Sequence, residues 1–166
     1  MKTPNTPSLR AAHTARWATT MTRWAIRYAS TGKRSGTRAA KRWQFIAFAG
    51  AMGAESRGIV DLVAIRRDHT TAPGGVFLPG DLFEIVLVQI KGGGAAWPSV
   101  RDLTRLRAVQ RRYRAKAVVL AAWQKGAEPR FHLMRRVSAD RGRAWAEVKA
   151  VDVFGIGVRA RGSHRV

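Results

Sequence analysis

The chain contains no cysteine and no long apolar run. The absence of cysteine excludes disulfide bridges, thiolate zinc sites and cysteine nucleophiles, and it fits a reducing compartment such as the cytoplasm. The most apolar stretch, Ile85–Ile90, has the length of a strand and not of a membrane span. The glycines Gly92–Gly94 are not followed by the Lys-Ser/Thr pair of a phosphate-binding P-loop. Several common kinds of site are therefore excluded before any motif is considered.

Acidic residues are also scarce, and none precedes Glu55. Ten Asp and Glu stand against 31 Lys and Arg, which gives a formal net charge of +21. Such an excess opposes compaction unless a polyanion neutralises it, so nucleic acid is the favoured partner. An anionic membrane surface is the weaker alternative. An arginine-rich proteome would explain part of the charge without any partner.

The 166 residues are enough for one domain with a proper core and too few for two ordinary ones. Residues 1–8, rich in Thr and Pro, are expected to form a flexible tail, and residues 156–166 a basic C-terminal tail. From Leu9 to Tyr28 apolar residues recur at helical spacing, which predicts an amphipathic helix. Its aromatic stripe is interpreted as core packing in preference to a base-stacking platform; the stripe consists of Trp17, Met21, Trp24 and Tyr28. A mitochondrial transit peptide is a less favoured interpretation of this start.

The remainder of residues 9–155 alternates between strand and helix patterns. A helix is expected after Ser99, the predicted N-cap, with Asp102 completing a capping box. The apolar run that ends at Lys91 suggests a buried central strand. The order of elements predicts an α/β or α+β fold with a central mixed β-sheet flanked by helices. Strands are expected at Trp43–Ala49, Ile59–Arg66, Leu82–Lys91, Ala117–Trp123, Arg130–Val137 and Trp145–Val153.

Three polar residues in the second and third expected strands form the main candidate site. Side chains alternate across a strand, so Gln89 and Lys91 face the same way and Ile90 faces the other. If the two strands pair, Asp61 meets Gln89 and Lys91 on one face of the sheet. Polar groups at the end of a buried apolar strand are costly unless they have partners. A shared site with Asp61 supplies such partners.

The segments Gly58–Ile65 and Leu87–Gly92, which carry Asp61 and Gln89-Ile90-Lys91, resemble the active-site hairpin of PD-(D/E)XK nucleases. The likeness is strongest to the Holliday-junction-resolvase and restriction-endonuclease-like branches, and it covers roughly residues 40–123. It implies a restriction-endonuclease-like fold and a divalent-metal-dependent deoxyribonuclease. Asp61 would then be a metal ligand, Gln89 a second and weaker ligand, and Lys91 the cation that contacts the attacking water or the scissile phosphate. The implied cofactor is Mg²⁺ or Mn²⁺, and the implied setting is the cytoplasm of a bacterium or a phage host.

Two features depart from the family pattern. Gln89 stands where the family usually has an acid, so the site has one negative charge fewer for a hard cation. The family also often has a Glu on the first helix, where this chain has none. Glu55 is the acid close enough in sequence to serve as a substitute metal ligand, although a solvated loop position explains it equally well. Glu84 is an odd number of residues from Gln89 and is expected to face away from the site.

Arginines on the helix after Gly92 are candidate phosphate contacts, namely Arg101, Arg105 and Arg111. Gln110 lies on the same helix, where some branches of the family place a Gln near DNA, but its spacing favours a core or helix-surface role. The sequence thus predicts an endonuclease acting on DNA, with branched or structured DNA as one candidate substrate. The alternative is a nuclease-derived protein that binds nucleic acid without cleaving it. The resemblance also suggests homodimers, because related enzymes commonly pair two active sites.

Overall fold

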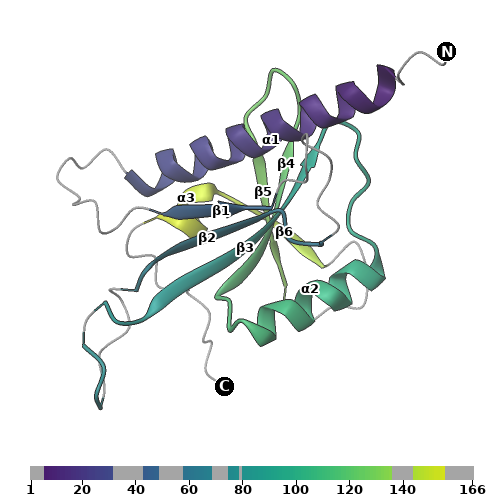
Figure 1. Ribbon diagram of the computed structural model, residues 1–166. Helices are drawn as coiled ribbons and strands as arrows, with labels where there is room; N and C mark the ends of the chain where they lie inside the picture. Colours follow the sequence, from purple (N-terminus) through teal and green to yellow (C-terminus); the bar gives the residue numbers. More distant parts are fainter. Residues whose placement is uncertain are drawn as a thin grey trace.

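The computed structural model describes residues 6–31, 43–48, 58–68, 75–78, 80–135 and 144–155, with side chains from residue 10 onward and without that of Thr31. Its centre is a six-stranded sheet in the order β1-β2-β3-β4-β5-β6. The helices lie on both faces of this sheet, α1 on one and α2 on the other (Figure 1). The strands are β1 (Gln44–Ala47), β2 (Leu62–Arg67), β3 (Phe83–Gly92), β4 (Ala117–Trp123), β5 (Arg130–Met134) and β6 (Trp145–Val148); the helices are α1 (Thr6–Thr31), α2 (Val100–Arg112) and α3 (Ala150–Phe154).

The sheet is mixed, as the order of elements predicted. Only β3 and β4 pair in parallel among the described strands, and α2 makes the crossover between them. The other neighbouring strands pair antiparallel. The prediction of an α+β fold with a mixed sheet flanked by helices is confirmed at this level.

Two apolar clusters hold the layers together, one on each face of the sheet. On one face Ile26 of α1 and Phe154 of α3 pack with Leu62, Val88 and other strand residues. On the other face Leu103 and Leu106 of α2 pack with Leu87, Val118 and Leu120. Alternate residues of β3 and β4 therefore serve opposite clusters, which is why both strands are apolar almost throughout.

Several predicted boundaries were wrong. Helix α1 begins at Thr6 and not at Leu9, so part of the expected N-terminal tail is helical. The last expected strand, Trp145–Val153, stops at Val148, and α3 follows from Ala150. The expected C-terminal tail lies outside the described residues, as does the end of the strand predicted at Arg130–Val137.

The interpretation of the aromatic stripe on α1 as core was also wrong. Trp17, Trp24 and Tyr28 are 48%, 66% and 78% exposed. The buried face consists instead of small or polar residues spaced four apart, together with one isoleucine: Ala18, Thr22, Ile26 and Ser30. Small side chains let the helix lie close to the sheet, and the bulky aromatic residues turn outward.

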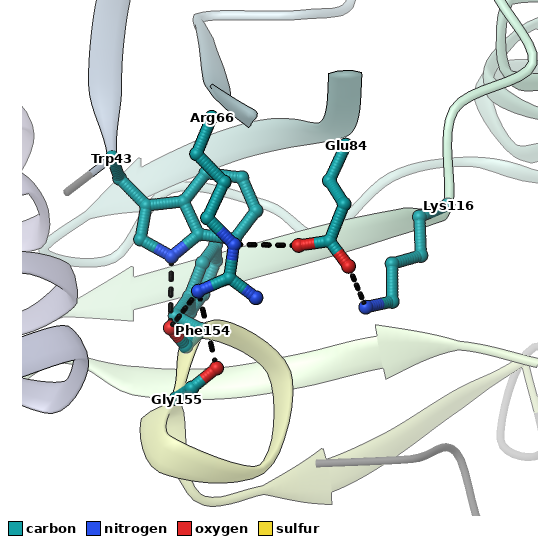
Figure 2. Close-up of polar contacts among 6 residues, drawn as sticks. All are labelled: Trp43, Arg66, Glu84, Lys116, Phe154 and Gly155. Atoms are coloured by element: carbon teal, nitrogen blue, oxygen red, sulfur yellow. Dashed lines mark hydrogen bonds and ion pairs between the residues drawn. The ribbon is translucent and has the colours of Figure 1, made fainter. Parts of the chain in front are cut away.

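A buried ion-pair network ties α3 to the sheet (Figure 2). The Arg66 Nε atom donates to Glu84 Oε2 at 2.5 Å, and Lys116 Nζ donates to Glu84 Oε1 at 2.5 Å. Arg66 also donates to the backbone carbonyls of Phe154 and Gly155, both at 3.2 Å. Its guanidinium lies 4.4 Å from the ring centroid of Trp43, in a cation–π contact. Glu84 therefore has a structural role and faces away from Gln89, as the spacing predicted.

Candidate active site

The start of β2 and the end of β3 bring the predicted site residues together. Leu62 pairs with Val88 in the antiparallel register, so Asp61 lies beside Gln89. The Asp61 N–H donates to the Val88 carbonyl, and the Phe48 N–H donates to the Asp61 carbonyl, both at 3.0 Å. The backbone of Asp61 is thus held from two sides, by β3 and by the residue that follows β1.

The carboxylate of Asp61 is directed at the motif on β3. Its Oδ2 atom accepts a hydrogen bond from the Ile90 N–H at 2.6 Å. This places the negative charge at the residue between Gln89 and Lys91. A short bond from a backbone N–H to a carboxylate is charge-assisted and fixes the position of the acid. The same bond would form if Asp61 only stabilised the start of the strand. The residues around Asp61 therefore have to distinguish a structural role of this carboxylate from a functional one.

Gln89 is the most unusual of the three residues, because it is buried and incompletely bonded. Its exposed fraction is 7%. Within the described part of the chain, its Oε1 atom is buried and has no hydrogen-bond partner. A buried amide oxygen without a partner costs about 1–3 kcal/mol. That cost is removed if a cation or a hydrogen-bond donor from a ligand occupies the site.

A cavity of about 700 Å³ lies at these residues, between α1 and the ends of the strands. Asp61, Gln89 and Lys91 line one part of it, and Thr14, Arg16 and Arg23 of α1 line another. The described lining contains three basic residues, Arg16, Arg23 and Lys91, and one acidic residue, Asp61. A site of this charge suits a phosphate group better than a neutral or cationic substrate.

Gly92 allows α1 to cross the end of β3 at this point. A Cβ atom added to Gly92 would lie 3.0 Å from Thr14 Cγ2 and 3.2 Å from Ala18 Cβ. The helix and the strand therefore approach more closely than a side chain at position 92 would permit. This approach brings Arg16 and Arg23 to the cavity.

The sequence did not predict which basic residues of α1 line the cavity, namely Arg16 and Arg23. The acid-free start of the chain indicated a basic helix, but not which of its arginines line the cavity. The three arginines proposed on α2, namely Arg101, Arg105 and Arg111, do not line the cavity. Gln110 donates to the Ala115 carbonyl at 3.3 Å, a contact at the end of α2. Glu55, the proposed substitute metal ligand, lies outside the described residues.

The donor set can be tested against the implied metal ion. In the described part of the chain, no group of three or more His, Asp and Glu side chains could hold a metal. Asp61 and Gln89 together offer one carboxylate and one unbonded amide oxygen. Both are oxygen ligands of the kind that Mg²⁺ and Mn²⁺ accept, and Mg²⁺ usually keeps several waters in sites with one or two carboxylates. By ligand type, these two oxygens suit such a cation, and water would supply the remaining ligands.

The capping box of α2 lies close to the site and fixes the helix that follows Lys91. Ser99 Oγ donates to Asp102 Oδ2 at 2.7 Å, and the Asp102 N–H donates back to Ser99 Oγ at 3.2 Å. The hydrogen bonds from the Ser99 hydroxyl and backbone lower the pKa of Asp102, with smaller contributions from Arg105 and Lys91.

The lowered pKa of Asp102 predicts a pH-dependent contribution to stability. A depressed carboxyl pKa stabilises the fold above the unfolded-state pKa, and this contribution is lost as the pH falls through the folded-state pKa. Asp102→Ala is therefore expected to lower the free energy of unfolding by about 0.3–1 kcal/mol at neutral pH. The difference from the wild type should shrink below pH 3.8. Urea unfolding at neutral pH and near pH 3 measures it, and a difference that grew at acid pH would contradict this assignment.

None of the described helices is long and apolar enough to cross a membrane. Comparison with protein-family models, curated proteins and solved structures gave no match to this chain.

Proposed function

We propose that the protein is a divalent-metal-dependent nuclease that hydrolyses phosphodiester bonds in DNA, with Asp61, Gln89 and Lys91 as its site. The observation that carries the proposal is the buried Gln89 oxygen that has no partner among the described residues, beside the Asp61 carboxylate, in a cavity lined by arginines. Core packing does not explain this grouping. The resemblance to the PD-(D/E)XK hairpin assigns the same three residues to catalysis.

Each residue has a distinct part in the proposed reaction. Bound by Asp61 and Gln89, a divalent cation would acidify a water molecule and neutralise charge that builds on phosphorus. Lys91 would hold the scissile phosphate or the attacking water by its charge. Arg16 and Arg23 would bind the neighbouring phosphates and fix the direction of the strand in the cavity. The Ile90 N–H keeps the Asp61 carboxylate in place before substrate arrives.

A second candidate is a protein that binds nucleic acid at this cavity without cleaving it. The observation in its favour is the single carboxylate among the described cavity-lining residues. With Gln89 in place of an acid, the cavity carries more positive than negative charge even before a cation binds. Such a cavity would hold a phosphate without any metal.

An assay of the wild-type protein separates the two candidates. Labelled linear duplex, nicked duplex, four-way junction and single-stranded DNA are incubated with Mg²⁺ or Mn²⁺, and with EDTA as the control. The nuclease predicts cleavage that requires the metal. Salt-sensitive binding without cleavage, and without heat on titration with Mn²⁺ in calorimetry, would reject the nuclease in favour of the binding protein.

A further inference from the structure

The outer face of α1 carries a row of exposed aromatic residues. Trp17 contacts the ring of His13, one turn earlier on the same helix. Trp17, Trp24 and Tyr28 lie seven and four residues apart, so they form one row along the helix. The rise of an α-helix places the first two about 10 Å apart and the last two about 6 Å apart. All three are exposed. Figure 1 shows α1 with one side toward the sheet and the other side open. A row of exposed aromatic residues on a basic helix requires an explanation other than the core.

A second row runs beside the first, because an arginine immediately precedes each aromatic residue. These pairs are Arg16-Trp17, Arg23-Trp24 and Arg27-Tyr28. One residue corresponds to about 100° of rotation, so the arginine row is displaced round the helix by a constant angle.

The arginine row lies on the side of α1 that faces the cavity and β1. Arg16 and Arg23 line the cavity. The guanidinium carbons of Arg23 and Arg27 lie 5.7 and 5.5 Å from the ring centroid of Phe45 in β1. The two rows thus join the outer face of α1 to the rim of the proposed site.

We infer that α1 is a docking surface for single-stranded nucleic acid. In this arrangement the phosphates lie along the arginine row and unpaired bases stack on the aromatic row. Aromatic side chains bind bases through their faces, and this binding is tolerant of sequence. The bases of an intact duplex are already stacked on one another and cannot reach the row. The inference rests on the proposed function in one respect, because it takes the cavity to receive the phosphodiester that continues from this strand.

Charge complementarity selects this occupant over a second copy of the chain. Helix α1 contains no acid, so two copies meeting along this face would bring like charges together. The outer row also contains no Leu, Ile or Val between its aromatic residues, whereas helices that lie in a membrane interface present a broad apolar face. A polyanion with exposed aromatic rings matches both rows at once.

The test measures binding in EDTA, so that no cleavage can occur. Fluorescence anisotropy is recorded with a labelled oligothymidylate of about 20 nucleotides and with a duplex of the same length. The variant Trp17→Ala/Trp24→Ala/Tyr28→Ala is compared with the wild type. Alanine has the higher helix propensity, so α1 is expected to remain folded, which circular dichroism checks. The matched control is Trp97→Ala, because Trp97 is 49% exposed but lies outside α1.

The triple variant is expected to bind the single strand at least about tenfold more weakly, with less than about threefold change for the duplex. Trp97→Ala should change neither affinity. The variant Trp17→Tyr/Trp24→Tyr keeps an aromatic ring at each position of the row, so it should retain most of the single-strand affinity. Replacing the three arginines by glutamine should instead reduce the salt dependence of binding.

Three results would overturn the inference. The first is single-strand binding by the triple variant that equals that of the wild type, and the second is an equal loss of affinity in Trp97→Ala. The third is that the triple variant loses affinity for lipid vesicles or for a second copy of the chain but not for the single strand. The last is measured as binding to vesicles of phosphatidylcholine and phosphatidylglycerol, or as self-association in sedimentation. Rejection of the docking surface on α1 can be distinguished from rejection of the proposed nuclease activity. Metal-dependent cleavage with unchanged binding by the triple variant would reject the docking surface alone. Stacking-dependent binding without cleavage would reject the nuclease alone.

Discussion

Asp61→Asn is expected to abolish metal-dependent cleavage and to leave the fold intact. An asparagine oxygen can still accept the hydrogen bond that the Ile90 N–H donates to Asp61 Oδ2. The negative charge, however, is lost from the only acidic residue among those that line the cavity in the described structure. We expect the cleavage rate to fall by about 100- to 1,000-fold, and Mn²⁺ binding in calorimetry to disappear. The melting temperature should change little.

Gln89→Glu is the matched change in the opposite direction. A second carboxylate beside Asp61 adds a charged ligand at the position that now offers a neutral amide oxygen. Mn²⁺ affinity is expected to rise by about tenfold or more, because affinity for hard cations increases with the number of charged ligands. Without metal, two neighbouring carboxylates should raise the pKa of one of them.

Lys91→Met completes this set, since it keeps the length of the side chain and removes its charge. We expect it to reduce cleavage while Mn²⁺ binding persists. Asp61→Asn protein that cleaves at the wild-type rate, or Gln89→Glu protein without a gain in Mn²⁺ affinity, would show that these residues are not the metal site.

Glu84→Ala is expected to cause the largest loss of stability. Glu84 is 6% exposed and accepts hydrogen bonds from both Arg66 and Lys116. Removing the carboxylate leaves the buried Arg66 guanidinium with carbonyl partners but, among the described residues, no countercharge (Figure 2). Breaking one side of a buried ion pair typically costs about 3–5 kcal/mol. Guanidinium chloride unfolding measures the change in the free energy of unfolding. If the transition remains two-state, the free energy should fall with denaturant concentration at the same slope in the variant and the wild type.

A double-mutant cycle shows whether the loss comes from the unpaired charge. Replacing both partners, in Glu84→Leu/Arg66→Met, should be much less destabilising than the sum of the single changes. Lys116→Met serves as the exposed control, because the Lys116 side chain is 40% exposed and its ion pair is screened by water. Its expected effect is below about 1 kcal/mol. Additive effects of Glu84→Leu and Arg66→Met would contradict the proposed coupling.

Local sequence patterns determined much of the fold. Strand β4 was predicted with its observed bounds, Ala117–Trp123, because its apolar run is continuous. The Ser99 cap and the Asp102 capping box were also predicted, since both depend on residues three apart in the chain. Hydrogen bonding and side-chain alternation within a few residues are enough to specify such features.

The proposed site was determined by sequence only in part. The alternation of β3 gave Gln89 and Lys91 a common direction, and the antiparallel pairing of β2 with β3 placed Asp61 beside Gln89. The sequence could not show that the Gln89 oxygen is buried without a described partner, because burial depends on everything packed around it. Nor could it identify Arg16 and Arg23 as lining residues, since these come from a helix far away in the chain.

The face of α1 that packs on the sheet was decided by the tertiary structure alone. Helical spacing defined a row of aromatic residues and, equally well, a row of small ones. Hydrophobicity favoured the aromatic row as core, but the close approach at Gly92 admits only small side chains, and the row that contains Ala18 is the one buried. The sequence by itself therefore determined the order of the strands, the N-cap of α2 and the grouping of Asp61 with Gln89 and Lys91. Steric fit between helix and sheet, a property of distant residues brought together, decided which side of α1 faces the solvent.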